Sequence, residues 1–152
     1  MHTRLLKSPI KKLIVFSVAL MIAQKATAEA IQIKSTNFDT FSTEVAHIEA
    51  GDVVKWIPTS KGHNVEFLAG PDMDNLPPSS VMDVPHTVRF DQPGIYLYGC
   101  KPHLNIGMLG LIVVDKDLHN IDKVLETALS PVPKSVLRKL LLHAKSYQKL
   151  DG

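Results

Sequence analysis

Four side chains of this sequence could together bind one metal ion. Cys100, His103 and Met108 occur in the spacing Cys-x2-His-x4-Met, and His63 lies upstream of them. A cysteine thiolate is a soft anionic ligand, an imidazole is a borderline nitrogen ligand, and a methionine thioether is a soft but weak ligand. The chemistry to expect from this set is therefore the binding of a soft or borderline metal.

The mixture of ligand types indicates which metal. Zinc sites are filled by cysteine, histidine and carboxylate side chains, and a methionine adds little to them. Two histidines and one cysteine in a trigonal plane, with a long axial methionine, characterise the blue-copper site. We therefore predict one type 1 copper ion, cycling between Cu(I) and Cu(II), with the ligands His63, Cys100, His103 and Met108. We predict no organic cofactor and no catalytic residue.

Other residues of the same types are weaker candidates. Each of the four ligands alone would be an ordinary residue, so the prediction depends on their joint spacing. Met73 and Met82 lie in the Gly- and Pro-rich segment 69–85, where single methionines usually pack on the edge of a domain. Four histidines have no second ligand at metal-binding spacing: His47, His86, His119 and His143.

Short strands separated by turns must position these ligands. Residues 30–115 contain alternating or β-branched apolar runs with Gly and Pro turns between them, and no alternation of strands with helices. Cys100 follows one such run and Met108 precedes another, so the ligand loop is fixed at both ends. The pattern predicts an all-β sandwich or barrel, with strands near 31–33, 45–48, 53–57, 86–90, 95–98 and 110–114 and another that begins near His63.

The pattern changes to a helical period after Asp115. Apolar residues from Ile121 to Ala128 fall on one helical face, with Asn120 as the expected cap. A second amphipathic helix is predicted from about residue 134 to residue 150. We expect residues 117–152 to form a helical extension packed on the sandwich. A basic stripe on the second helix is either a solvated face or, alternatively, a membrane-surface contact; it consists of Lys134, Arg138, Lys145 and Lys149.

The first 28 residues have the features of a secretory signal peptide. Residues 1–12 are basic without an acidic residue, an apolar run covers residues 13–23, and Ala26 and Ala28 form an A-x-A cleavage site. The run of 11 residues is shorter than the ~20 that a membrane-spanning helix needs, so we expect no stable membrane insertion after processing. The mature chain would begin near Glu29, with a copper domain in residues 29–116, and would lie in the periplasm.

Removal of residues 1–28 changes the charge of the chain. The whole sequence has a formal charge of +2, and residues 1–28 hold five basic residues and no acidic one, so the mature chain would carry −3. We therefore expect no nucleic-acid binding. Cys100 is the only cysteine, so its presence in an exported chain is not explained by a disulfide.

The segment from Gly99 to Gly110 resembles the ligand loop of cupredoxins. Its spacing matches both pseudoazurins and plastocyanins, and residues 61–66 are similar to the pseudoazurin stretch around the first histidine. Helices after the last strand occur in pseudoazurins and not in plastocyanins, so the chain is identified as a member of the pseudoazurin group. In residues 104–107 it departs from the Tyr-Gly-Met-Gly that is common in the family, so the surface beside His103 differs.

The resemblance implies a fold, a function and one positioning contact. The fold is a Greek-key β-sandwich of about eight strands with two C-terminal α-helices. The function is periplasmic transfer of single electrons to or from a redox protein such as a nitrite reductase. The contact is made by Asn64, which would tie the His63 segment to the ligand loop and hydrogen-bond near the Cys100 sulfur.

Three functions are compatible with these ligands. The first is a one-electron carrier, and the alternative is a periplasmic copper chaperone or storage protein, although the Met-rich or His-rich tracts usual in chaperones are missing from the sequence. A copper enzyme needs an open coordination position, and four protein ligands leave none, so we predict that the chain is not an enzyme. We expect a monomer that docks on redox proteins through an apolar patch around His103, made locally basic by Lys61 and Lys101.

Overall fold

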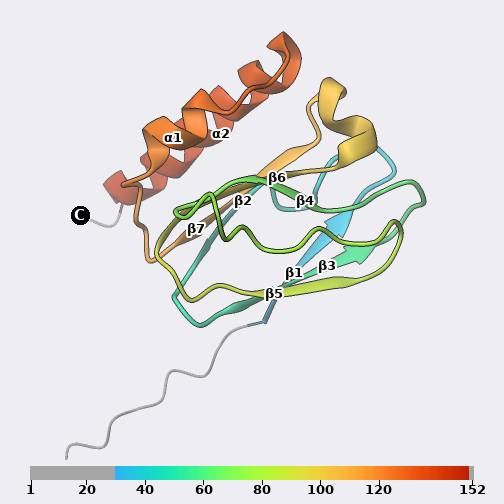
Figure 1. Ribbon diagram of the computed structural model, residues 1–152, viewed down its shortest axis with the longest axis horizontal. Coiled ribbons are helices and arrows are strands. Elements are labelled where there is room, and N and C mark those ends of the chain that lie inside the picture. Colours follow the sequence, from blue (N-terminus) through green and yellow to red (C-terminus); the bar gives the residue numbers. More distant parts are fainter. Residues whose placement is uncertain (1–29, 151–152) are drawn as a thin grey trace, which may run out of the picture.

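Two β-sheets packed face to face form the centre of the fold, and two α-helices cover the outer face of one of them (Figure 1). The computed structural model describes residues 30–150, so the predicted signal peptide lies outside the described residues. One sheet has the strand order β1-β3-β5 and the other the order β2-β7-β6-β4. The strands are β1 (Ala30–Ser35), β2 (Val45–Ile48), β3 (Val53–Pro58), β4 (Glu66–Ala69), β5 (His86–Arg89), β6 (Gly94–Gly99) and β7 (Leu109–Val114).

The chain passes from one sheet to the other after each of the first five strands. Two of the resulting neighbours are parallel, β1 with β3 and β2 with β7, and the remaining pairs are antiparallel. Among the described strands, only β6 and β7 are consecutive in sequence and paired within one sheet, and the connection between them is the ligand loop. The predicted β-sandwich is confirmed.

Six of the seven strands agree with their sequence predictions to within two residues at each end. One difference concerns the first histidine, because β4 begins at Glu66 and His63 lies in the loop before it. The described residues form seven strands, where the resemblance implies about eight. An isolated bridge between Ser35 and Phe41 adds one further ladder contact.

Aromatic side chains fill the space between the two sheets. The Trp56 ring lies 5.1 Å from the Tyr98 ring and 5.8 Å from the Phe67 ring, both edge to face, an arrangement that aromatic pairs prefer. Burial of each such side chain contributes roughly 1.5–3 kcal/mol to folding. Cys100 and Met108 belong to the same apolar cluster, so the core of the sandwich extends directly into the proposed metal ligands.

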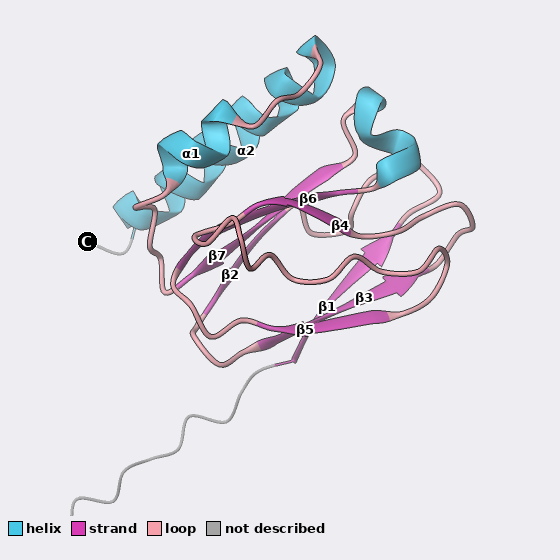
Figure 2. Cartoon of the chain, viewed as in Figure 1, coloured by secondary structure: helices cyan, strands magenta, loops and turns pink. Residues whose placement is uncertain are grey.

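Every residue of β6 and β7 is buried. One face of these strands packs against the other sheet, and the opposite face packs against the helices, as Figure 2 shows. This explains why residues 109–114 read as a continuous apolar run instead of an alternating one. The two strands that carry the ligand loop are therefore the most enclosed of the fold.

The helical layer consists of α1 (Ile121–Glu126) and α2 (Pro131–Leu150). Helix α2 buries Leu137, Leu140, Leu141 and Ala144 in a cluster shared with the outer face of β6 and β7. It begins earlier than predicted, at Pro131, because proline is well tolerated in the first turn of a helix. In residues 30–150 no helix combines the length and the apolar character that crossing a membrane requires.

Two side chains of the helical layer have roles that differ from their predictions. Lys134 is half-buried, and its Nζ donates to the carbonyl oxygens of Leu125 and Thr127 at the end of α1, so it also ties α2 to α1. Asn120 stands at the N-cap position of α1 but makes no capping bond. Its buried amide instead accepts a hydrogen bond from the Ile95 N–H at 2.9 Å and donates one to the Ile95 carbonyl at 2.8 Å.

We expect Asn120→Ala to destabilise the protein by roughly 2–4 kcal/mol, because it leaves both backbone groups of Ile95 buried without a partner. Chemical denaturation measures this difference. The matched control is Asn75→Ala, in an exposed loop, for which a change within about 0.5 kcal/mol is expected. Equal effects of the two substitutions would contradict the bridging role of Asn120.

Candidate metal centre

The ligand loop is a 3₁₀-helical turn, η1 (Lys101–Ile106), held between β6 and β7. Cys100 immediately precedes the turn, and its N–H donates to the Met108 carbonyl at 3.1 Å, which extends the β6–β7 ladder by one bond. The Met108 N–H donates to the His103 carbonyl at 3.2 Å. These bonds tie three of the predicted ligands into one rigid backbone unit.

Gly107 allows the chain to close this turn. Its φ is 95°, in the left-handed region that favours glycine. A Cβ at this position would also lie 2.8 Å from a methyl group of Val136 on α2. The residue immediately before Met108 is therefore restricted to glycine by both backbone conformation and packing.

His63 is fixed by the long loop that precedes β5. The Asp83 carboxylate accepts hydrogen bonds from the N–H groups of Gly62, at 2.7 Å, and His63, at 3.0 Å. The Asp83 N–H donates to the His63 carbonyl at 2.8 Å, and Ser80 holds Val65 through a second pair of bonds, both 2.8 Å long. The loop thus clamps the first histidine from one side.

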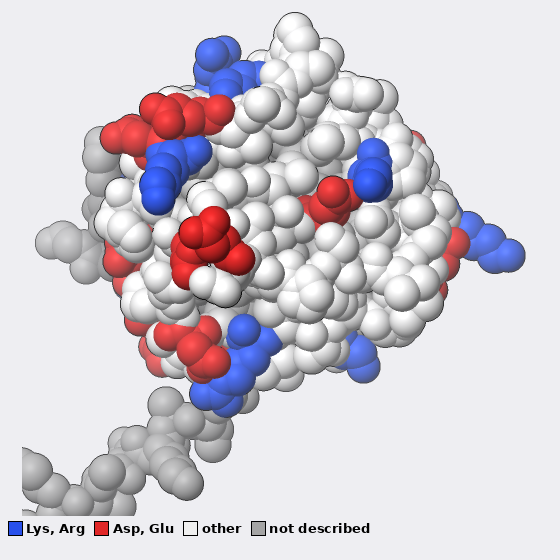
Figure 3. All heavy atoms as spheres, viewed as in Figure 1, with Lys and Arg blue, Asp and Glu red and all other residues white. Residues whose placement is uncertain are grey.

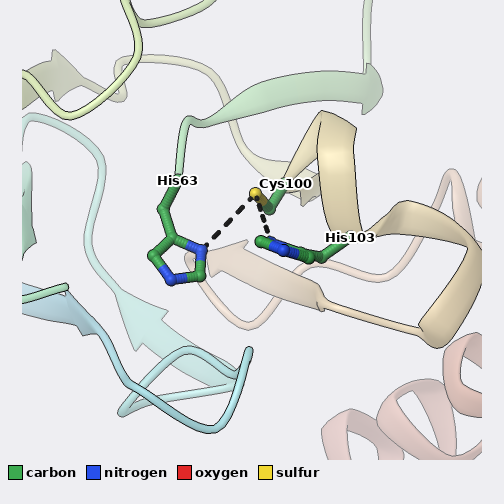
Figure 4. Close-up of side chains that lie close together, drawn as sticks. All are labelled: His63, Cys100 and His103. Carbon is green, nitrogen blue, oxygen red and sulfur yellow. Dashed lines mark hydrogen bonds between the residues drawn. The ribbon is translucent and has the colours of Figure 1, made fainter. Parts of the chain in front are cut away.

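The two imidazoles converge on the Cys100 sulfur (Figure 4). The Cys100 Sγ lies 3.7 Å from His63 Nδ1 and 3.4 Å from His103 Nδ1. Among the residues that the structure describes, these three form the one group of histidine, cysteine and acidic side chains arranged to hold a metal. Both histidines present the same nitrogen, Nδ1, to the sulfur.

These distances fit a shared metal ion. Nitrogen and sulfur atoms at metal distances of about 2.0–2.1 and 2.3 Å, separated by tetrahedral or trigonal angles, lie about 3.5–3.8 Å apart. The two observed distances of 3.7 and 3.4 Å agree with this range to about 0.1 Å. The mixed sulfur and nitrogen set is also the one that copper prefers. The residues present therefore fit a type 1 copper ion.

Met108 is placed for the fourth position, and the other methionines of the described chain differ from it. Met108 is 1% exposed and shares the apolar cluster of Cys100. Met73 and Met82 are 46% and 42% exposed in the loop 69–85. Met108 alone combines burial with backbone bonds to both His103 and Cys100.

The surroundings of the Cys100 sulfur are partly polar. Burial raises the pKa of the Cys100 thiol, whereas hydrogen bonds from the backbone N–H groups of Asn64 and His103 lower it, and the charges of Asp39 and Asp83 raise it further. The raised pKa favours the protonated thiol in the metal-free protein. A bound metal cation favours the thiolate, because the thiolate is the form that acts as a ligand.

Asn64 makes the contact that the resemblance implies. Its side-chain oxygen accepts a hydrogen bond of 2.8 Å from the Lys101 N–H, which joins the His63 segment to the ligand loop. Its backbone N–H hydrogen-bonds to the Cys100 sulfur. One residue therefore sets the spacing between the two segments that carry the ligands.

The two histidines differ in exposure. The His63 side chain is 4% exposed and the His103 side chain is 26% exposed, so His103 is the one that reaches the surface. Ile106, in the same turn, is 60% exposed. Pro102 is also exposed and Leu104 is half-buried, whereas Leu109, which sequence proximity would add to this group, is buried. The apolar surface beside His103 is therefore smaller than predicted.

The prediction that this end is basic is wrong. Lys101 Nζ lies 4.0 Å from a Glu66 carboxylate oxygen, and the Asp39 carboxylate lies 3.5 Å from His103 Nε2. Figure 3 likewise shows acidic and basic side chains in small mixed groups on the visible face, without a large area of one sign. The fold brings Glu66 to Lys101 and Asp39 to His103, and these acidic residues are far from the lysines in sequence.

Asp39 and Asp83 are the two site residues that the sequence did not reveal. Asp39 is 24 positions before His63 and Asp83 is 20 positions after it, and neither has metal-ligand spacing to Cys100. Both adopt a positive φ, 53° and 59°, which aspartate tolerates better than other side chains. A positive φ at an aspartate leaves no signal in the sequence, so these two turns are seen only in the structure.

Three of the four other histidines make contacts away from the ligands, and the fourth, His143, is exposed on α2. His47 stacks on Tyr147 with ring centroids 3.9 Å apart, and His86 lies 2.9 Å from the Pro78 carbonyl. His119 lies 3.0 Å from the Asp117 carboxylate. None of these groups contains a second histidine or a cysteine.

Comparison with known proteins gives matches over most of the chain. Residues 27–115 match the model of the family described as copper binding proteins, plastocyanin/azurin family. A Rhizobium leguminosarum bv. viciae protein with a provisional pseudoazurin name is 33% identical over 140 residues, which cover 87% of this chain and 90% of that protein. Pseudoazurin of Methylorubrum extorquens is 31% identical over 113 residues, or 70% of this chain and 76% of that protein.

A solved structure shows the same fold. The crystal structure of pseudoazurin from Methylobacterium extorquens AM1 superposes with a TM-score of 0.67 at 26% identity. The superposition covers 76% of this chain and 98% of that one. The similarity therefore includes the sandwich and extends beyond the ligand loop.

Proposed function

Because the chain belongs to the plastocyanin/azurin family of copper-binding proteins, we propose that it is a periplasmic carrier of single electrons with the copper ligands His63, Cys100, His103 and Met108. The observation that carries this proposal is the convergence of two histidine Nδ1 atoms on one buried sulfur, at 3.7 and 3.4 Å. Copper held by these ligands supplies the Cu(I)/Cu(II) couple.

The protein's part in electron transfer is to keep the ligands still. Cys100, His103 and Met108 are joined by backbone hydrogen bonds, and Asp83 and Asn64 hold the His63 segment against them. Because these hydrogen bonds fix the backbone around the ligands, the same ligand geometry serves Cu(I) and Cu(II). Little rearrangement therefore accompanies the gain or loss of an electron. Burial of His63 and Cys100 excludes water from the centre.

We propose that the electron leaves through the exposed edge of His103. Beside it in η1, Pro102 and Ile106 are exposed and Leu104 is half-buried. Leu104 and Ile106 are expected to make close contact with a partner. Electron-transfer complexes bury less than ~1,200 Å², so a small apolar patch with mixed charges at its edge is sufficient. The proposed partners are redox proteins such as a nitrite reductase, and we propose that the carrier is a monomer.

The proposed location and domain division depend on the N-terminal residues. The expected signal peptide, residues 1–28, would direct the chain to the periplasm, and the mature protein would consist of a copper domain in residues 29–116 and a helical extension in residues 117–152. N-terminal sequencing of the protein recovered from a periplasmic fraction tests both points. A start far from Glu29 would contradict them.

Rapid electron exchange together with tight retention of copper tests the proposed function. The copper-loaded protein is expected to exchange electrons with a redox protein in milliseconds to seconds and to keep its copper during prolonged incubation with a competing chelator. Slow exchange together with ready loss of copper would contradict an electron carrier and favour a copper chaperone or store.

We expect Ile106→Glu to lower the second-order rate of electron transfer to a nitrite reductase by roughly tenfold, because a charge replaces the centre of the apolar contact. Stopped-flow measurement of the bleaching of the oxidised protein checks this. The matched control is Leu142→Glu on α2, a residue 67% exposed, which should keep the original rate. Both variants should retain the visible spectrum. An unchanged rate for Ile106→Glu would place the docking surface elsewhere.

A further inference from the structure

One carboxylate lies between the outer edges of both histidines. Asp39 Oδ1 is 3.5 Å from His103 Nε2 and 3.8 Å from His63 Nε2. These are the nitrogens that do not face the Cys100 sulfur, since the Nδ1 atoms do. Each imidazole is therefore placed with the sulfur at one nitrogen and the carboxylate at the other.

The loop that presents Asp39 is held in shape by its own hydrogen bonds. The Thr36 N–H donates to the Thr40 carbonyl at 2.9 Å, and the hydroxyl groups of these two threonines lie 2.8 Å apart. Outside this turn, Ser42 and Lys34 are joined by bonds of 2.8 and 2.9 Å. These hydrogen bonds therefore hold the loop before and after Asp39.

The loop is also anchored in the core. Phe41 is 4% exposed and packs edge to face on Tyr98, with ring centroids 4.8 Å apart. Asp39 itself has a φ of 53°, a conformation that aspartate and asparagine adopt more readily than other residues with side chains. The position of the carboxylate is therefore set by the fold and not by a flexible tether.

We propose that Asp39 is a positioning residue of the metal centre, which orients His63 and His103 and favours Cu(II) over Cu(I). The proposal rests on the proposed function. When Nδ1 binds a metal, the imidazole proton resides on Nε2, and the N–H dipole points its positive end at the carboxylate. Carboxylates that face the outer nitrogen of a metal-bound histidine hold the ring and strengthen it as a ligand.

The sign of the effect follows from charge. Cu(II) carries one more positive charge than Cu(I), so a fixed negative charge beside both ligands stabilises the oxidised form more than the reduced form. At 3.5 and 3.8 Å the contacts are longer than the 2.7–3.2 Å of a direct N–H···O hydrogen bond, so the interaction is mainly electrostatic. The Asp39 side chain is 40% exposed, and water and salt therefore weaken it.

The expected effect of removing this charge is moderate and directional. Asp39→Asn should weaken Cu(II) binding about three- to tenfold relative to Cu(I) binding, and thus raise the reduction potential by at most about 59 mV, the equivalent of a factor of ten for one electron. Asparagine keeps the size of the side chain and its tolerance of a positive φ. The blue colour should remain, because all four ligands remain.

The test compares reduction potentials of the copper-loaded wild type, Asp39→Asn and Asp122→Asn by voltammetry at low and high ionic strength. Asp122 is an exposed residue of α1, so its substitution changes the net charge equally without touching the ligands. Asp39→Asn should raise the potential, and the difference from wild type should shrink as salt increases. Asp122→Asn should keep the wild-type potential at both salt concentrations.

A second variant and a second measurement separate charge from structure. Asp39→Gly permits the same backbone conformation and should raise the potential in the same direction. Competition titrations should give the three- to tenfold loss for Cu(II) and a smaller change for Cu(I). A blue wild type whose potential matches that of Asp39→Asn, or a difference that salt does not reduce, would overturn the role of Asp39. A wild type that is not blue would overturn the proposed function and this inference with it.

Discussion

Cys100→Ser is expected to abolish the intense visible absorption of the oxidised protein. The band of a type 1 site arises from charge transfer between the cysteine thiolate and Cu(II), and a serine hydroxyl is a hard, weakly acidic donor that cannot replace it. Cys100 is the only cysteine of the chain, so no other thiolate is available. His63 and His103 could still hold some copper, as a weakly coloured site.

The absorption spectrum of the copper-loaded variant measures this effect, and its metal content separates loss of colour from loss of copper. Serine has nearly the size of cysteine, so circular dichroism of the metal-free variant should match that of the wild type and serves as the control for folding. A variant that stayed intensely blue would show that the Cys100 sulfur is not the ligand.

Met108→Gln is expected to keep a coloured site and to lower its reduction potential. A glutamine oxygen is harder than a thioether sulfur and therefore favours Cu(II) over Cu(I). A ten- to hundredfold change in the ratio of the two affinities corresponds to roughly 60–120 mV for one electron. This shift has the opposite sign to that expected for Asp39→Asn, so the two variants check each other.

Voltammetry of Met108→Gln and of Met73→Gln tests the axial ligand. Met73 is 46% exposed in the loop before β5, and its substitution should leave the potential unchanged. An unchanged or higher potential for Met108→Gln would contradict its assignment as the axial ligand, and Met82→Gln would then be measured next.

The parts of the fold that could be predicted from sequence are those with local signals. Residues 53–57 and 95–98 carry β-branched and aromatic runs bounded by Gly and Pro, and both are strands. The ligand loop was also predictable, because Cys100, His103 and Met108 lie within nine positions of one another. Short sequence separation is what makes such a site recognisable.

The parts that could not be predicted depend on contacts between distant segments. Asn120 has the residue type of a helix cap, yet the fold brings it to the backbone of Ile95, 25 positions away. His47 had no signal for stacking on Tyr147, which comes from α2 at the other end of the chain. A side chain with two possible hydrogen-bonding roles takes the one that satisfies buried backbone groups, and only the tertiary structure shows which groups are buried.

The charge of the docking end could not be predicted for the same reason. Lys61 and Lys101 adjoin the ligands in sequence, whereas Asp39 and Glu66 reach that end through separate elements, a loop after β1 and the first residue of β4. Net charge counted along the chain describes solubility and long-range attraction. Local charge at a binding surface depends on topology.

The visible and electron paramagnetic resonance spectra of the copper(II)-loaded protein test the central claim most directly. A ligand set of two histidine nitrogens, one thiolate and one thioether predicts an intense blue or green thiolate band and a small parallel hyperfine splitting, because the unpaired electron is shared with the Cys100 sulfur. The metal-to-protein ratio should be one. A pale protein with a weak band and the large splitting of ordinary nitrogen- and oxygen-bound copper would contradict the account.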